Sequence, residues 1–239
     1  MRYLVSLALG IAAGAAIALG FLYYNPFTSA SALSPLMVSD QEQVTFNYSA
    51  VAEHAIAYTN NGESRVKPHP DKILQLWEAP IRETDIFVTE LRGSRNDTVG
   101  IGFKLSSKSE RTRVLNGEAL VDSVWYLFLP DQGTLLIAQT ENYWSYLRDI
   151  VVPAHWSGGN GWRGNWHGQI TSGPGALGTA QVFGGSGRYR GVEAEAIETL
   201  SAKAYSSERG PVAMDGQLIV EFARGENELT ANTGSTSRE

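Results

Sequence analysis

The chain of 239 residues contains no cysteine. This absence excludes a disulfide framework, thiol nucleophiles and thiolate metal ligands. The sequence also lacks any long basic stretch, its formal net charge is −6 and its pI is about 5.3. Proteins that bind nucleic acid ordinarily present a basic patch or stripe, so this composition argues against a nucleic-acid partner.

Charge is missing altogether from Tyr3 to Tyr24, a run of 22 residues. At about 1.5 Å per residue a helix of this length spans roughly 33 Å, enough to cross a bilayer. Residues 1–27 are therefore predicted to be a transmembrane anchor, with residues 3–24 in the membrane. Arg2 precedes the run and no basic residue follows until Arg65. The positive-inside rule then places the N-terminus in the cytoplasm and the rest of the chain in the periplasm or outside the cell.

A cleaved signal peptide is the alternative interpretation of the same run. Ala30-Ser31-Ala32 offers small residues at the two positions that a signal peptidase reads. The protein would then be secreted after cleavage near Ala32. The apolar run exceeds the usual signal-peptide core of about 7–15 residues, which favours a retained anchor.

Small residues recur every fourth position along this predicted helix, at Gly10, Gly14 and Ala18. A stripe of this type lets a second helix approach closely, and it predicts a transmembrane partner subunit or a homo-oligomer. The alternative is that glycine and alanine are simply common in membrane helices.

Beyond the anchor the sequence is predicted to be mainly β. Residues 28–83 form a polar stalk and lead-in segment, 84–223 form one β domain, and 224–239 form a disordered tail. β-branched and aromatic residues concentrate in short runs separated by Gly, Pro, Asn and Asp, which indicates an antiparallel barrel or sandwich. The predicted strands are 44–48, 85–91, 98–105, 119–129, 134–139, 166–172, 179–183, 192–205 and 213–222.

The glycine-rich stretch GGSGRYRG, residues 184–191, admits two interpretations. A phosphate-binding loop would open a helix. The residues that follow alternate instead, with apolar side chains at every second position from Val192, so the stretch is predicted to be a turn between strands. Its structural glycines are Gly184, Gly185, Gly187 and Gly191.

The segment AQVFGGSGRYRGVEAEA resembles the allene oxide cyclase and dirigent family, in which a Gly-Gly-x-Gly-x-x-x-G turn leads into a long strand. WYLFLPDQGTLLIAQ and DIFVTELRGSRND are similar to a hairpin and the first barrel strand of that family. The likeness is loose over residues 84–222 and good over 179–197. It implies an antiparallel eight-stranded barrel with a ligand-sized interior.

The resemblance carries over little of the family's catalytic set. Glu90 falls where the family has a glutamate, but Arg92 occupies the position of a neighbouring amide, and the cysteine is missing. Dirigent proteins use inward carboxylates, and Glu90 and Glu198 are the candidates for such catalytic roles. Glu198 shares a face with small apolar residues, so an inward side chain would be buried with a raised pKa. The alternative is a β-bulge that turns it outward, or a paired structural carboxylate.

Residues 141–168 are longer than the family's connection and are predicted to be a loop rich in tryptophan. They could cover the barrel mouth over an apolar ligand, stack on sugars, or dock a membrane or partner. The alternative is a small core that plugs one barrel end. The aromatic candidates for a ligand-binding or lid role are Trp144, Trp156, Trp162, Trp166 and Tyr143.

The sequence predicts no metal and no cofactor. His155 and His167 bracket the tryptophan-rich loop, but catalytic zinc requires three protein ligands. No Gly-x-Ser-x-Gly motif supports a hydrolase. We therefore expect a membrane-anchored extracytoplasmic β-barrel protein that binds a small apolar or amphipathic ligand, or serves as an accessory subunit of a membrane complex. The alternative is an isomerase or cyclase with an interior carboxylate.

Overall fold

A computed structural model describes residues 2–23, 42–67, 69–156 and 158–222. The predicted signal cleavage site, most of the predicted stalk before residue 42 and the predicted tail lie outside the described residues. The helices are α1 (Arg2–Tyr23), α2 (Ala79–Arg82), α3 (Trp144–Tyr146) and α4 (Val152–Trp156), with a π-helical turn at Leu147–Val151 and 3-10 turns at Ala52–His54 and Val114–Asn116. The strands are β1 (Glu42–Ser49), β2 (Ala57–Asn60), β3 (Glu63–Val66), β4 (His69–Gln75), β5 (Asp85–Arg92), β6 (Thr98–Lys108), β7 (Leu120–Leu129), β8 (Gly133–Asn142), β9 (Gly161–Gln169), β10 (Thr171–Gly173), β11 (Ala180–Gly187), β12 (Ala194–Ser206) and β13 (Gly210–Phe222).

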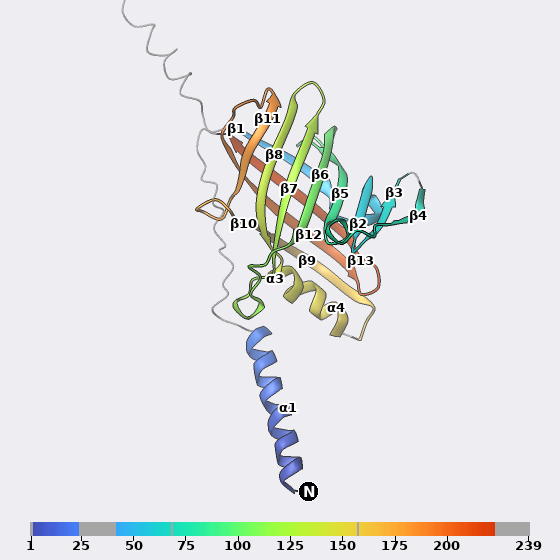
Figure 1. Cartoon of the computed structure of the whole chain (residues 1–239), viewed down its shortest axis with the longest axis vertical. Coiled ribbons are helices and arrows are strands. Elements are labelled where there is room, and N and C mark those ends of the chain that lie inside the picture. Colours follow the sequence, from blue (N-terminus) through green and yellow to red (C-terminus); the bar gives the residue numbers. More distant parts are fainter. Residues whose placement is uncertain (1, 24–41, 68, 157, 223–239) are drawn as a thin grey trace, which may run out of the picture.

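Eight of these strands form a closed antiparallel ring, in the order β1-β13-β12-β11-β8-β7-β6-β5 (Figure 1). A single residue pair, Asn47 with Arg92, joins β1 to β5 and closes the ring. The prediction of a mainly β, antiparallel protein is confirmed, and the ring is barrel-like. Its inward side chains form the core, which includes Leu91, Leu127 and Leu218.

The alternation and turn signals of the sequence located the ring strands well. The strands predicted at 119–129 and 134–139 are β7 and β8, which form a hairpin joined at Pro130–Gly133, where Asp131 and Gly133 have φ of 64° and 122°. Turn residues tolerate such left-handed backbone best when they are Gly, Asn or Asp. β12 buries the face that carries Ala194, Ala196 and Leu200, as its period-two pattern predicts.

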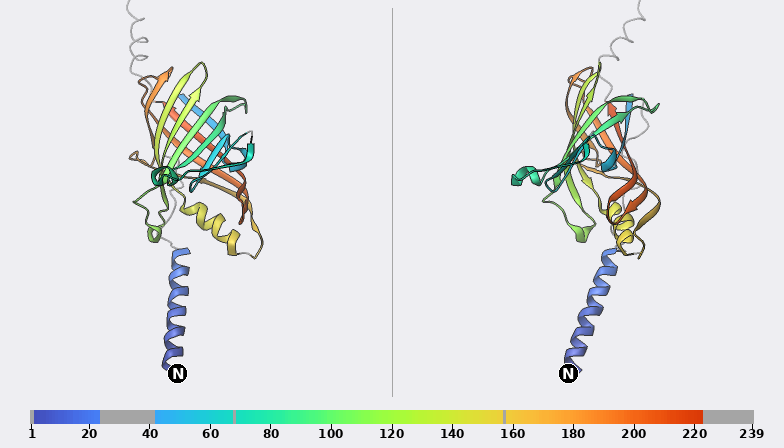
Figure 2. Two further views of the ribbon diagram at one scale, coloured as in Figure 1. Left: turned by 45° about the vertical axis from the view of Figure 1, so that its right-hand side comes forward. Right: turned by 90° about the vertical axis from the view of Figure 1, so that its right-hand side faces the viewer.

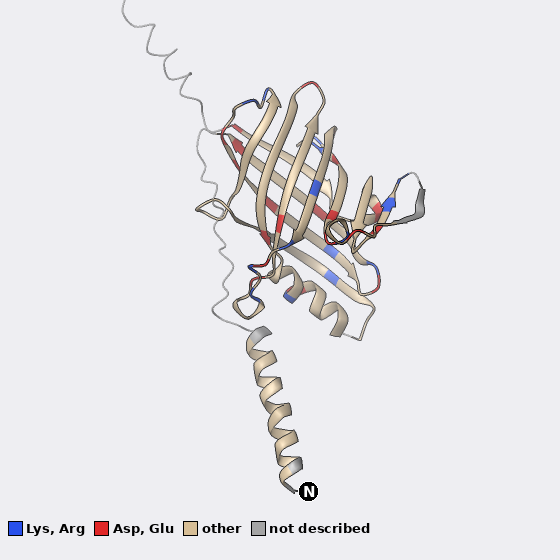
Figure 3. Cartoon of the chain, viewed as in Figure 1, with Lys and Arg blue, Asp and Glu red and all other residues tan. Residues whose placement is uncertain are grey.

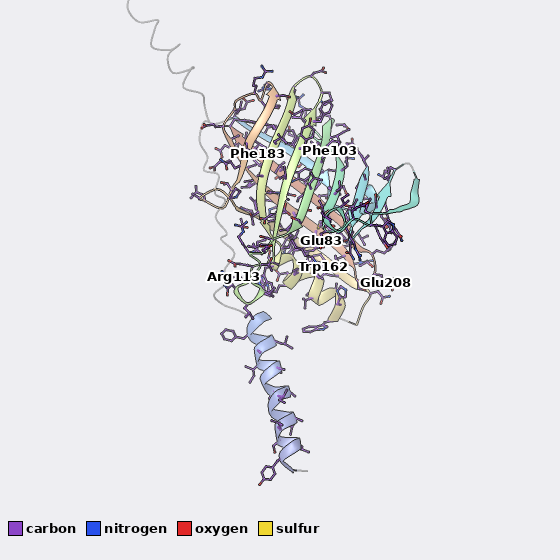
Figure 4. All side chains as sticks on the ribbon, viewed as in Figure 1. Glu83, Phe103, Arg113, Trp162, Phe183 and Glu208 are labelled. Atoms are coloured by element: carbon purple, nitrogen blue, oxygen red, sulfur yellow. The ribbon has the colours of Figure 1, made fainter. Side chains whose placement is uncertain are left out.

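The strand β6 has the reverse of the usual pattern. Gly100, Gly102 and Lys104 are buried on the inner face of the strand, whereas the large apolar side chains that alternate with them are exposed. Phe103, which is labelled in Figure 4, is one of these outer residues. These outward residues, Ile101, Phe103 and Leu105, are 37%, 38% and 47% exposed. The small inward residues leave room for bulky side chains from other strands. Those side chains, and not the side chains of β6, fill the interior next to β6.

Two segments were not predicted as strands. The lead-in segment contains β2 and β3, which extend the sheet outward from β5 through the turn at Asn60–Gly62. β4 also lies in this segment, pairs with β3 and ends at Gln75, after which the chain has no regular structure until α2.

The tryptophan-rich insertion is ordered structure rather than the expected irregular loop. Its first half is the run from α3 through the π-helical turn to α4, which lies at one end of the ring (Figure 2). Its second half contains β9, which pairs with the C-terminal half of β12. The helical run buries Tyr146, Ile150 and Ala154, one apolar side chain per helical turn, so we call residues 144–156 the end helix.

The N-terminal run is helical, as predicted, and α1 extends away from the ring (Figure 1). Within the part of the chain that the structure describes, no helix combines the length and apolarity needed to cross a membrane. The predicted transmembrane anchor is therefore not confirmed. The stripe of Gly10, Gly14 and Ala18 is exposed, so a helix partner for it stays a prediction, as does the export of the domain.

Candidate functional site

Glu198 lies inside the ring and is fully buried on the inward face of β12. Its carboxylate accepts hydrogen bonds from Tyr48 Oη and Gln139 Nε2, from Trp125 Nε1 at 3.0 Å, and from Lys104 Nζ at 2.9 and 3.1 Å. These donors come from β1, β8, β7 and β6. No bulge turns Glu198 outward, and the ring directs four separate strands onto one carboxylate.

A second buried carboxylate, that of Glu141 on β8, shares the same lysine. Lys104 Nζ lies 2.9 Å from Glu141 Oε1, and Gln139 Nε2 donates to that oxygen at 2.7 Å. The Ser123 hydroxyl also donates to Oε1, and Tyr143 Oη donates to Oε2 at 2.6 Å. Lys104 thus bridges two carboxylates that are both fully buried.

Thr171 of β10 completes the network. Its hydroxyl donates to Gln139 Oε1 at 3.0 Å and accepts from the backbone N–H of Glu198 at 2.7 Å. The amide of Gln139 is thereby fixed with its nitrogen toward the two carboxylates. We call the following residues the buried cluster: Tyr48, Lys104, Ser123, Trp125, Gln139, Glu141, Tyr143, Thr171 and Glu198. Charged residues are otherwise sparse along the ring strands (Figure 3).

The two carboxylates of the buried cluster differ in pKa. Burial raises the pKa of Glu141, and the negative charge of Glu198 raises it further, with only partial compensation from Lys104. Burial also acts to raise the pKa of Glu198, but Lys104 and the hydrogen bonds from Tyr48 and Trp125 outweigh it and lower that pKa below its usual value. The raised pKa predicted for Glu198 is therefore wrong for that residue and belongs to Glu141.

The neighbouring groups keep their ordinary charge states. Burial acts to lower the pKa of Lys104, but Glu141 and Glu198 together raise it, so the lysine is an ammonium. Burial and the nearby Glu198 raise the pKa of Tyr48, and burial and Glu141 raise that of Tyr143, so both phenols stay protonated. Lys104 is thus the cation shared by Glu198, whose pKa is lowered, and Glu141, whose pKa is raised.

Glu90 does not join the buried cluster. Its neighbours Thr89 and Leu91 on β5 are buried, whereas the Glu90 side chain is 44% exposed and faces outward. It accepts a hydrogen bond from the Thr98 hydroxyl and lies 3.7 Å from Arg92. Its surroundings are those of an exposed surface ion pair.

The aromatic residues of the insertion take different positions. Tyr143 belongs to the buried cluster, and Trp162 and Trp166 pack against the core from β9. Each of these tryptophans covers a glycine two residues later, where a Cβ on Gly164 or Gly168 would lie 2.8 or 2.6 Å from the indole. Trp144 is half-buried, and its indole nitrogen has no hydrogen-bond partner among the residues that the structure describes, whereas Trp156 is 74% exposed.

The glycine-rich stretch connects β11 to β12, with no helix after it. Gly184, Gly185 and Gly187 lie in β11 itself, and Gly191 ends the turn. Gly187 and Gly191 have φ of 61° and 68°. Gly185 meets the Tyr189 and Thr134 carbonyl oxygens so closely that a Cβ does not fit.

The two histidines of the insertion are engaged separately. His155 Nδ1 lies 2.8 Å from the Val151 carbonyl oxygen, and His167 Nδ1 lies 2.8 Å from the Ser201 hydroxyl. In the described ranges no group of three His, Cys, Asp or Glu side chains is arranged to hold a metal ion.

Surface hollows lie along the described part of the ring and the strands beside it. One of about 980 Å³ lies between β11 and β12, and one of about 390 Å³ lies beside the turn at Asn60–Gly62. The third, of about 420 Å³, includes Ser123 and Gln139 of the buried cluster in its lining, together with outward residues of β6, β7 and β8.

The ring and its buried cluster define a barrel-like protein with a lysine-bridged carboxylate pair inside. No protein-family model and no curated protein matches the chain. Among solved structures the chain is similar to the pterocarpan synthase dirigent protein PsPTS1, with 10% identity over 80% of this chain and 100% of that chain, at a TM-score of 0.39. It is also similar to the Diels Alderase AbmU from Streptomyces koyangensis, with 11% identity over 81% of this chain and 78% of that chain, at a TM-score of 0.34.

These neighbours are a dirigent protein and a Diels Alderase, and they do not test the allene oxide cyclase part of the sequence resemblance. The identities and TM-scores are low, and the likeness is one of fold.

Proposed function

We propose that the ring binds a small, neutral, mainly apolar molecule and transfers protons on it, as an isomerase or cyclase does. The observation that carries this proposal is a pair of fully buried carboxylates that share one buried lysine at 2.9 Å, with pKa values displaced in opposite directions. Where the surroundings of two titratable groups displace their pKa values in opposite directions, the group with the higher pKa can act as the acid and the other as the base. Glu141 is then the general acid, and Glu198 is the general base.

The free-energy cost of burying charged groups favours a functional role for the buried cluster over a purely structural one. Removing charged groups from water costs several kcal/mol per ion, and well-packed apolar side chains are often at least as stable in their place. The surrounding core is apolar, with Leu91, Leu127 and Ile137 fully buried. An apolar filling would therefore serve stability as well, and strongly perturbed groups of this kind concentrate at functional sites.

The roles of the other residues follow from their contacts. Lys104 holds both carboxylates within 3 Å and compensates the Glu198 charge. Tyr48 and Trp125 donate to Glu198, which tunes its basicity. Lys104 already pairs with both carboxylates, so the charge of an ionic ligand would be buried without a counterion from this cluster. This balance favours a neutral substrate.

We propose that the ligand enters beneath the end helix, in keeping with the lid role predicted for the insertion. Tyr143 immediately precedes α3, and its hydroxyl donates to Glu141 at 2.6 Å. A displacement of the end helix would pull this phenol from the general acid and open a path to it. The alternative role as an accessory subunit stays a prediction that co-purification of the intact chain would test.

Native mass spectrometry of the gently purified full chain tests ligand binding, since a bound small molecule adds a discrete mass. The chemistry is tested by hydrogen exchange into that molecule in D₂O, with 3-cyclohexenone as a neutral probe of isomerisation. E198Q is expected to abolish both reactions and E141Q to slow them by about 10²- to 10⁴-fold. E195Q removes an exposed carboxylate from the same strand and should have no effect. Unchanged conversion by E198Q and E141Q would overturn the proposal.

A further inference from the structure

Two glycines on the inner face of the ring lie against the aromatic donors of Glu198. Gly216 of β13 stands opposite Tyr48 in the β1–β13 register, and a Cβ there would overlap the Tyr48 ring and its hydroxyl oxygen. Gly102 of β6 lies beneath Trp125, where a Cβ would come within 2.8 Å of Trp125 Cζ3 and 3.0 Å of Leu91 Cδ2. Both glycines are buried.

We propose that Gly102 and Gly216 are positioning residues, whose missing side chains let Trp125 and Tyr48 reach the Glu198 carboxylate from two sides. The two rings contact each other edge to face, with centroids 5.1 Å apart. They form one packed unit around Glu198, so a displacement of either ring affects the hydrogen bonds of both.

Neither glycine is explained by backbone conformation. Both lie in the middle of their strands, and neither has the left-handed φ that favours glycine at Gly187 or Gly191. A side chain at these two positions is excluded by a neighbouring side chain. Gly100, on the same face of β6, differs because a Cβ there would first meet the Phe128 carbonyl oxygen of the backbone.

By setting the positions of Trp125 and Tyr48, the two glycines affect the protonation of Glu198. The titratable and charged groups that face this carboxylate are Tyr48 from β1, Lys104 from β6, and Glu141 and Tyr143 from β8 and the segment after it. Tyr48 and Trp125 stabilise the ionised form through hydrogen bonds. Withdrawal of these donors favours the protonated form, because hydrogen bonds to a charged group are lost.

The inference deepens the proposed function, but the experiment reads the carboxylate directly, so it can fail or succeed whatever the turnover. The full chain with ¹³C-labelled glutamate carboxyls is titrated by NMR, with the Glu198 signal assigned through E198Q. G216A is expected to raise the Glu198 pKa by about one unit, as the loss of a hydrogen bond to a charged group implies. G102A is expected to shift the Trp125 indole N–H resonance, assigned through W125F. G184A is the matched control, since a Cβ there meets only Leu136 at ordinary contact distance.

A folded G216A with an unchanged Glu198 titration would overturn the inference. If G216A fails to fold, the double variant G216A/Y48L tests the inference, because it removes the Tyr48 phenol ring with which the new Cβ would overlap. Restored folding supports the inference. Failure of the double variant to fold where Y48L alone folds would show that Gly216 is needed for another reason, and would overturn it.

Discussion

Lys104 is the residue that makes two buried carboxylates compatible with the fold. In the sequence it stands in the alternating run IGFKLSS, on the same face as Gly100 and Gly102 and opposite Ile101, Phe103 and Leu105. The apolar face of such a strand ordinarily turns inward, which would leave Lys104 in solvent. In the ring the opposite face of β6 is turned inward. Lys104 therefore lies in the interior, where it contacts Glu141 of β8 and Glu198 of β12.

The opposite pKa displacements predict opposite pH dependences for two conservative variants. Glu198 has a lowered pKa, so its stabilising contribution is present above its ordinary pKa of about 4.3 and is lost as the pH falls through the lower folded value. E198Q is therefore expected to cost about 3–5 kcal/mol at pH 7 and distinctly less below pH 4.

Glu141 has a raised pKa, so its contribution is present below the ordinary value and is lost as the pH rises through the folded one. E141Q mimics the protonated acid, and its deficit should shrink as the pH rises from 4 to 8. Urea unfolding across this range measures both effects. Parallel pH profiles for the two variants would contradict the assignment of Glu198 as base and Glu141 as acid.

At the scale of elements, the end helix is held by aromatic contacts rather than by charge. Tyr146 packs edge to face on Tyr143, Trp166 and Tyr205, with ring centroids 6.2, 5.8 and 6.2 Å apart. Aromatic pairs of this geometry contribute about 0.5–1.5 kcal/mol each beyond area burial. Tyr146 is not among the aromatic residues predicted for a ligand-binding or lid role, because a loop was expected where the chain forms helices.

Removal of this anchor is expected to loosen the end helix selectively. Y146A should increase amide hydrogen exchange in residues 144–156 by at least tenfold, while the central amides of β7 and β8 keep their protection. The Tyr143 contact to Glu141 should weaken with it, because Tyr143 packs on Tyr146. W156A, which removes a side chain that is 74% exposed, is the control and should leave exchange unchanged. A uniform rise over the whole ring would show that the end helix does not open independently.

At the scale of the molecule, the closure of the ring depends on one narrow junction. β1 pairs with β13 over eight residue pairs, whereas its ladder with β5 consists, among the described residues, of the single pair Asn47 and Arg92. The Asn47 side chain reinforces this point, since Nδ2 donates to the Gly93 carbonyl at 3.3 Å and Oδ1 accepts from Gln217 Nε2 at 3.0 Å. Asn47 directly precedes Tyr48 on β1. The residue that closes the ring and a residue that donates to Glu198 are therefore neighbours in the same strand.

N47A is therefore expected to cost about 1–2 kcal/mol in the free energy of unfolding, the usual range for lost side-chain hydrogen bonds. Amide exchange at the β1–β5 junction should rise first, and the indole resonance of Trp125 should shift as Tyr48 gains freedom. T45A, on the same outward face of β1 but without a β5 neighbour, is the control. An N47A protein with wild-type stability and exchange would show that the ring closes without this side chain.

The sequence by itself determined most strands and turns, since alternation and Gly, Pro, Asn and Asp act over a few residues. The 119–139 hairpin and the buried face of β12 were predicted for that reason. The tertiary structure alone decided which face of β6 is inside and which polar groups meet Glu198. Its partners Tyr48, Lys104 and Trp125 lie 150, 94 and 73 residues away along the chain. Alternation defines two faces of a strand without saying which is interior, and only closure of the ring brings such distant residues into hydrogen-bonding distance.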